Sequence, residues 1–320
     1  MKKNQKSQFI GLDKFLLLIK DAVKEALGEG YNVEINHVIK NNSIELDGLI
    51  VLKDQECVSP NIYLNPYYEK YLAGTSLKKI AEEIIGIYRQ RKENVHYANL
   101  QICYELNEMK SRIIYRLINY EKNRKLLKDV PHIPFLDLAV TFHCLVRNHE
   151  KGIGTIRITN EHMKNWNIDM EYLKKVAGWN TPVLFPPVIR SINDLILELL
   201  QEDKSFSCAN PNNEKYLSDK HIFGEKSNTM YVISNEKGIN GASCLLYPGI
   251  IKNLANKLNS DLFILPSSIH EIIAVKADGS ISKKAFQEMV VEVNRTQVPK
   301  EDILSDNVYF YSRKRNAITL

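Results

Sequence analysis

Residues 231–276 read YVISNEKGINGASCLLYPGIIKNLANKLNSDLFILPSSIHEIIAVK, and this stretch is the best-defined structural unit of the chain. Its apolar runs predict strands separated by a glycine-containing turn, a helix and a loop. Pro248 suits the first turn of the helix, because proline lacks the N–H that a helix start leaves unpaired. The order strand, helix, strand permits a right-handed crossover. The predicted strands are 231–234, 242–247, 262–265 and 272–275, with a hairpin between the first two.

The loop between the last two of these strands brings Ser, His and Glu close together in sequence, as PSSIHE at 266–271. A serine hydroxyl becomes reactive when a base lies beside it, so the loop offers a nucleophile, a base and an orienting acid. The candidate catalytic residues are Ser267, Ser268, His270 and Glu271. In an extended chain, Ser268 and His270 share a face at roughly 6–7 Å, and Glu271 points to the opposite face. The alternative interpretation is a structural turn whose hydroxyls cap backbone groups.

Length and composition place the chain among folded proteins. Of its 320 residues, 44% are hydrophobic and 25% are charged, which is enough for roughly two domains with cores of their own. Residues 201–229 are polar and contain Asn210-Pro211-Asn212-Asn213, a composition typical of a linker or surface loop. We therefore predict an N-terminal α+β region at 1–200, a polar linker or loop at 201–229 and a C-terminal α+β domain at 230–320.

The N-terminal region is predicted to begin with a small α-β-β-β-α module that ends near residue 94. Its elements are a helix at 11–27, a hairpin at 31–52, a strand at 62–64 and a helix that starts near Leu77. After it we expect a helix at 97–108, a strand at 112–118, a charged helix to 128, antiparallel strands at 138–146 and 156–158, two short helices ending at Gly178, a connector at 182–187 and a helix at 192–200. The C-terminal domain adds a helix at 282–293 and a strand at 308–311. The predicted fold class is α+β, with mixed and antiparallel sheets, flanking helices and two domains.

Charge and cysteine content exclude several classes of protein. The formal net charge of +5 is small, so any attraction to nucleic acid must come from local clusters of basic residues. Five widely spaced cysteines without a CxxC pair argue against a disulfide framework or a zinc module, and predict reduced, buried thiols. Four histidines between His132 and His162 do not have the spacing of a known metal site. We therefore expect neither a metal nor a cofactor.

The N-terminus is basic, but the apolar segment at 15–19 is interrupted by charges and has no small-residue cleavage site. No apolar run approaches the roughly 20 residues of a membrane span. We expect a cytoplasmic protein that does not bind a membrane.

A basic segment between Lys110 and Lys128 carries seven basic residues against one acidic residue, Glu121. Tyr115 and Tyr120 lie among them. Basic groups neutralise phosphates and tyrosines stack on unpaired bases, so the segment suggests a nucleic-acid surface. A solvated helix face is the alternative interpretation. The candidate nucleic-acid-binding residues are Arg112, Arg116, Lys122, Arg124 and Lys125.

Several stretches of the chain resemble a known family. They are NIYLNPYY at 61–68, RIIYRLINYEKN at 112–123, VPHIPFLDLA at 130–139, YPGI at 247–250 and LPSSIHE at 265–271. Together they resemble the bacterial domain-of-unknown-function family 5688 over most of the chain, and the region 137–177 is also similar to family 1444. The resemblance implies an intracellular bacterial protein associated with mobile elements. It supplies no activity for any residue.

No complete catalytic, metal or phosphate motif is present, so the sequence favours a non-catalytic binding or accessory factor whose partner is another protein. The first alternative is a hydrolase that uses a Ser/His pair in the 266–271 loop. The second is a nucleic-acid-binding regulator.

Overall fold

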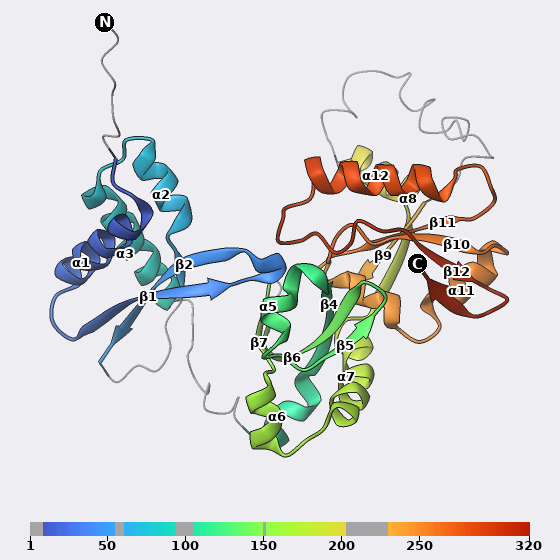
Figure 1. The fold of residues 1–320 in the computed structure, drawn as a ribbon, viewed down its shortest axis with the longest axis horizontal. Coiled ribbons are helices and arrows are strands. Elements are labelled where there is room, and N and C mark those ends of the chain that lie inside the picture. Colours follow the sequence, from blue (N-terminus) through green and yellow to red (C-terminus); the bar gives the residue numbers. More distant parts are fainter. Residues whose placement is uncertain (1–8, 55–60, 94–104, 150–151, 203–229) are drawn as a thin grey trace, which may run out of the picture. The chain divides into compact units, whose positions relative to one another are not determined.

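The computed structural model describes residues 9–54, 61–93, 105–149, 152–202 and 230–320. Its contacts divide the chain into two compact units, unit 1 at 1–104 and unit 2 at 105–320. Every described strand pairing is antiparallel, in three sheets flanked by helices (Figure 1). The predicted α+β class is confirmed. The described sheets contain no parallel pair, so the expectation of mixed sheets is not met within these ranges.

Unit 1 contains the α-β-β-β-α module, with one additional helix. Its elements are α1 (Leu12–Leu27), β1 (Tyr31–Ile39), β2 (Glu45–Lys53), β3 (Ile62–Tyr63), α2 (Asn65–Leu72) and α3 (Leu77–Glu93). Phe15, Ile19 and Val23 lie on one side of α1 and are fully buried in the core of this unit. Asn42 in the turn between β1 and β2 has a φ of 57°, a conformation that asparagine tolerates. The sequence prediction missed α2, which is short and carries Pro66 in its first turn.

The first sheet of unit 2 has β6 at its centre. Its strands are β4 (Ile113–Asn119), β5 (His132–Phe135), β6 (Leu138–His149) and β7 (Gly152–Arg157). β4 pairs with one edge of β6, and β5 and β7 pair with successive parts of the other edge. We call this the four-stranded sheet. The predicted antiparallel pair at 138–146 and 156–158 corresponds to β6 and β7, whereas β5, which contains Pro134, was missed.

A six-stranded sheet forms the rest of unit 2, in the order β13-β12-β10-β11-β9-β8. The strands are β8 (Pro187–Ser191), β9 (Tyr231–Asn235), β10 (Leu262–Leu265), β11 (Ile272–Lys276), β12 (Tyr309–Ser312) and β13 (Ala317–Thr319). β8 precedes the predicted linker at 201–229 and β9 follows it, and these two strands pair from Pro187 with Asn235 to Ser191 with Tyr231. The sequence on either side of the predicted linker therefore contributes to one sheet.

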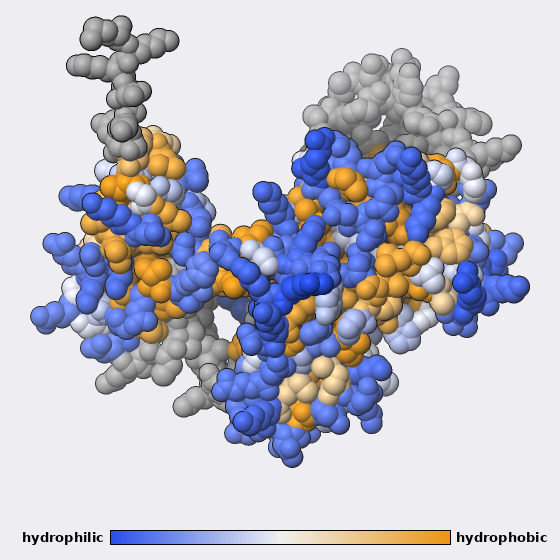
Figure 2. All heavy atoms as spheres, viewed as in Figure 1, coloured by the Kyte–Doolittle hydropathy of each residue, from blue (hydrophilic) through white to orange (hydrophobic). Residues whose placement is uncertain are grey.

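The helices of unit 2 lie beside these sheets. They are α4 (Leu106–Met109), η3 (Lys110–Arg112), η4 (Glu121–Asn123), α5 (Arg124–Leu127), α6 (Asn160–Trp166), α7 (Met170–Leu184), α8 (Ile192–Glu202), η5 (Gly241–Leu246), α11 (Ile250–Leu258) and α12 (Lys283–Thr296). Trp166 ends α6, and Trp179 on α7 is 77% exposed. Hydrophilic side chains cover much of the outer side of α12 in Figure 2, while Phe286 and Val290 face the core. No described helix combines the length and the apolar character that a membrane span requires.

Three predicted elements differ from the structure. The expected strand at 242–247 is the 3-10 helix η5, whose residues 241–245 are all buried. A continuous apolar run of this kind lacks the periodicity that would distinguish a buried strand from a buried helix. α7 continues past Gly178 and through Pro182 to Leu184. Of the expected helix at 97–108, residues 97–104 lie outside the described ranges, and α4 occupies 106–109.

Candidate functional site

The predicted catalytic loop is a closely bonded turn in the structure. The backbone N–H of His270 donates to Oγ of Ser268 over 3.0 Å, and Ser268 is 5% exposed. The carbonyl of Ser267 accepts a hydrogen bond from Leu304 N–H. The Ser268 hydroxyl therefore acts as a cap on the backbone, and no described contact joins it to the imidazole of His270.

Both ring nitrogens of His270 have partners. Nδ1 lies 3.3 Å from the backbone N–H of Asn240, and Nε2 lies 3.5 Å from Oδ1 of Asp302. Since the amide can only donate, Nδ1 is the acceptor and the ring proton is on Nε2, facing the carboxylate. The structure thus brings His270 to Asp302 and not to Glu271. Asp302 is distant in sequence from the PSSIHE loop, and no local pattern could have indicated it.

The predicted nucleic-acid-binding residues do not form one continuous surface of unpaired charge. Lys122 lies 3.4 Å from Asp306, and Arg124 lies 2.7 Å from Glu121, so each has a carboxylate partner. Arg112, in η3, and Lys125, in α5, are exposed. Arg116 lies elsewhere, on a face of the four-stranded sheet.

Strand register places three cationic or potentially cationic side chains on that face. Arg116 on β4 is opposite Thr141 on β6. His143 on β6 is opposite Ile114 on β4 and Arg157 on β7. Side chains at opposite or alternate positions of paired strands point to the same side of a sheet. Arg116, His143 and Arg157 therefore form one group, which we call the arginine cluster.

The arginine cluster is desolvated. His143 is 6% exposed, and Arg116 and Arg157 are half-buried. Burial, with the nearby charge of Arg157, lowers the pKa of Arg116 to about 10, and burial also lowers the pKa of Arg157. Burial and the two guanidinium groups hold the pKa of His143 well below its usual value. His143 is therefore neutral at pH 7, and its Nε2 lies 3.1 Å from Oγ1 of Thr141.

Neither guanidinium of the arginine cluster forms an ion pair with a carboxylate in the part of the chain that the structure describes. Nε of Arg116 is buried and has no hydrogen-bond partner there. The same holds for Oγ of Ser243 in η5. Both residues line a small cavity, whose free volume for the centre of a water molecule is about 10 Å³. The other lining residues are Ile114, Tyr115, Ile153, Thr181, Phe185, Asn235, Ile239, Asn240 and Tyr247.

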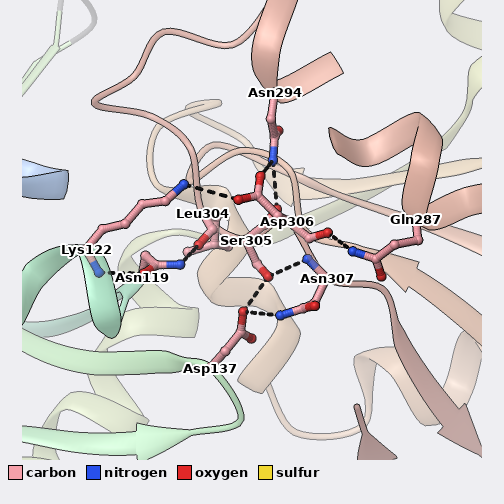
Figure 3. A network of polar contacts seen from close by, with 9 residues as sticks. All are labelled: Asn119, Lys122, Asp137, Gln287, Asn294, Leu304, Ser305, Asp306 and Asn307. Atoms are coloured by element: carbon pink, nitrogen blue, oxygen red, sulfur yellow. Dashed lines mark hydrogen bonds and ion pairs between the residues drawn. The ribbon is translucent and has the colours of Figure 1, made fainter. Parts of the chain in front are cut away.

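A second polar group in unit 2 has its partners within the chain (Figure 3). Asp137, in the turn between β5 and β6, points toward the segment that leads into β12. Its carboxylate accepts hydrogen bonds from Ser305 Oγ over 2.5 Å, from Asn307 Nδ2 over 2.9 Å and from the Tyr309 hydroxyl over 2.5 Å. Asn119 Nδ2 donates to the carbonyl of Leu304 over 2.9 Å. This group fastens the four-stranded sheet to the segment before β12, and its chemistry is structural.

The two described cysteines, Cys144 and Cys244, are buried and form no disulfide with each other. Burial raises the pKa of the Cys244 thiol to about 12. The other three cysteines lie outside the described ranges. Among the described residues, no group of three or more His, Cys, Asp or Glu side chains could hold a metal ion.

Sequence reasoning named Arg116 but assigned it to an extended nucleic-acid surface. It did not single out Arg157 or Ser243. The signal for the arginine cluster is the strand register, which brings residues 116, 143 and 157 together and cannot be read from local spacing.

The model of a family of unknown function, DUF5688, matches residues 12–313. No curated protein and no solved structure matches the chain. The match confirms the resemblance of the sequence stretches to that family.

Proposed function

We propose that this chain, which belongs to the DUF5688 family of unknown function, is a non-catalytic binding protein. It recognises an anionic group of its partner through the arginine cluster. Unit 2 supplies the site. The partner we favour is another protein that presents a compact acidic group.

The observation that carries this proposal is the half-buried pair Arg116 and Arg157 without a carboxylate among the described residues. Removing a charge from water costs free energy unless a charge of opposite sign accompanies it. A ligand anion would supply that charge. Arginine suits this role because its planar fork donates two parallel hydrogen bonds to a carboxylate or phosphate.

Two features support a role in binding a partner over a role in catalysis. The arginine cluster has no carboxylate that could act as a general base, and its histidine is held neutral by burial and by the two guanidinium groups. In the PSSIHE loop, both ring nitrogens of His270 are engaged, by Asn240 and by Asp302. Among the described residues, neither the arginine cluster nor the PSSIHE loop offers an activated nucleophile.

The charge distribution favours a compact anion over a nucleic acid. A nucleic acid is bound by many cationic side chains that neutralise successive phosphates. Here Lys122 and Arg124 are each paired with a carboxylate of the chain itself. Arg116 and Arg157, which form no ion pair with a carboxylate of the described residues, lie on one face of the sheet, on the two strands that flank β6.

The test compares the full chain with Arg157→Gln and with the control Arg124→Gln, whose guanidinium pairs with Glu121 on the surface. The melting temperature is measured against formate, phosphate and chloride at constant ionic strength. An anion that binds the folded state stabilises it by mass action, by about 2.7 kcal/mol at one hundred times its dissociation constant. We expect the rise in melting temperature to be lost in Arg157→Gln and kept in Arg124→Gln. Equal responses of all three proteins would contradict the proposal.

A further inference from the structure

Two buried hydrogen-bond donors without partners line the same cavity. Ser243 is 2% exposed, and its carbonyl accepts a hydrogen bond from the Tyr115 hydroxyl, but its own hydroxyl has no partner. Nε of Arg116 is likewise buried and has no hydrogen-bond partner among the described residues. Buried polar atoms in folded proteins almost always have a partner. Two such donors at one cavity indicate that an acceptor belongs between them.

The size of the cavity limits what this acceptor can be. Its free volume of about 10 Å³ admits the centre of one particle of about the size of a water molecule. Ile114, Ile153 and Phe185 form apolar walls. The side-chain donors of four polar lining residues are already bonded to backbone carbonyls, namely those of Tyr115, Thr181, Asn235 and Tyr247. A water molecule would also leave the charges of Arg116 and Arg157 uncompensated.

We propose that the cavity binds a single anionic atom, which accepts hydrogen bonds from Nε–H of Arg116 and Oγ–H of Ser243. The atom is either a halide ion or one oxygen of a larger carboxylate or phosphate ligand. This inference rests on the proposed function and gives it a location, at the contact between β4 and η5.

The PSSIHE loop holds the serine side of this site in place. The carbonyl of Ile269 accepts a hydrogen bond from Ala242 N–H, and Asn240 N–H donates to the His270 ring. Gly241 allows this contact, because a Cβ at that position would lie 2.4 Å from the carbonyl oxygen of His270. The loop that the sequence suggested as a catalytic site thus positions η5, and with it Ser243.

The experiment measures the apparent dissociation constant of chloride, bromide, formate and phosphate from their effect on the melting temperature of the full chain. Ionic strength is held constant with a bulky sulfonate, whose oxygens accept hydrogen bonds more weakly than those of a carboxylate or phosphate. The variants are Ser243→Ala and the control Ser260→Ala, whose half-buried side chain lies between α11 and β10 and does not line the cavity. We expect Ser243→Ala to raise the dissociation constant at least tenfold, and Ser260→Ala to leave it within twofold of the wild type.

The anions distinguish the two sources of the atom. Stabilisation by chloride and bromide identifies a halide site, which the anomalous signal of bromide in a crystal would locate between Arg116 and Ser243. Stabilisation by formate or phosphate alone identifies an oxygen of a larger ligand. Ser243→Cys, which keeps a small side chain but donates only weakly, replaces Ser243→Ala if the alanine variant does not fold.

Two results overturn the inference in different ways. If anions stabilise the wild type and Ser243→Ala equally, while Arg157→Gln abolishes the effect, the arginine cluster binds anions but the cavity does not. If no anion stabilises the wild type, the cavity binds no anion, and the proposed function fails with it.

Discussion

Two polar residues of unit 2, Asp137 and Arg116, differ in where their partners lie. Asp137 accepts hydrogen bonds from Ser305, Asn307 and Tyr309, all within the chain. Arg116 has a buried Nε without a partner among the described residues. Burying a polar group costs free energy unless it is paired, so the first residue indicates a structural contact and the second is the basis of the proposed ligand site. The difference can be tested one residue at a time.

His143 makes the stability of unit 2 depend on pH. Its pKa in the folded protein is well below the ordinary value of 6.5, because it is buried beside Arg116 and Arg157. Below pH 6.5 the unfolded chain therefore binds a proton at this position that the folded chain does not bind. The contribution of His143 to the free energy of unfolding is fully present above pH 6.5 and is lost as the pH decreases below that value.

We expect this residue to lower the free energy of unfolding by about 1.4 kcal/mol between pH 7.5 and pH 5.5, in the absence of added anions. His143→Gln should lack this part of the pH dependence, because glutamine does not titrate. Urea unfolding of both proteins at the two pH values gives the difference. Identical pH dependence in wild type and variant would show that His143 takes up its proton equally in both states.

Asp137→Asn should destabilise unit 2 by about 2–3 kcal/mol. An amide can accept from the Tyr309 hydroxyl, but its NH₂ group then faces another donor, the amide of Asn307. Tyr309 and Ser305 are fully buried, so water cannot replace the lost acceptor. Asp129→Asn is the matched control, since Asp129 is exposed, and we expect it to change stability by less than about 0.5 kcal/mol. Urea unfolding of the two variants measures their free energies of unfolding. Equal values would contradict the structural role of Asp137.

At the scale of elements, η5 is held by a close backbone contact. A Cβ on Gly241 would lie 2.0 Å from Oγ of Ser234 and 2.4 Å from the carbonyl oxygen of His270. Such distances require the PSSIHE loop and η5 to move apart. By contrast, a Cβ on Gly178 within α7 would meet no heavy atom within 4 Å.

These two glycines give opposite predictions for the same substitution. Gly241→Ala should cost about 2 kcal/mol or more, because its methyl group overlaps the backbone of a packed loop. Gly178→Ala should stabilise the protein by up to about 1 kcal/mol, because alanine is the better helix former. Thermal unfolding of both variants is the measurement. A stable Gly241→Ala protein would show that the loop and η5 are not in contact in solution.

The elements that could be predicted are those with strong periodicity. The helices α1, α3 and α12 carry regular apolar stripes, and β1, β2 and β6 alternate along much of their length. The missed strands β5, β8 and β13 are short, and the first two contain proline. The candidate site depends on register between β4, β6 and β7, which is a tertiary property. A single arginine such as Arg116 looks the same in sequence whether it faces solvent or a cavity.

At the scale of the whole molecule, the contacts divide the chain at 104/105, whereas composition suggested a division at 201–229. β8 lies before that segment and β9 after it, and they share five paired positions in one sheet. A fragment that contains only one of these strands loses this pairing. The strands of the four-stranded sheet, in contrast, all come from residues 113–157.

We expect the fragment 105–320 to unfold cooperatively with a midpoint close to that of unit 2 in the full chain, and the fragment 230–320 to lack a cooperative transition. The reason is that residues 230–320 leave β9 without β8 and remove the Asp137 contact to Tyr309. Circular dichroism during heating compares the two fragments. A cooperative transition in 230–320 would establish a domain boundary at 201–229.

The positions of the two tryptophans have a practical consequence for spectroscopy. Trp166 and Trp179 are the only tryptophans of the chain, and both belong to unit 2, on α6 and α7. Their intrinsic emission therefore follows the unfolding of unit 2 and does not report directly on unit 1, whose aromatic residues are tyrosine and phenylalanine. Excitation at a wavelength that tyrosine does not absorb thus separates the two units optically, without labels and without cutting the chain.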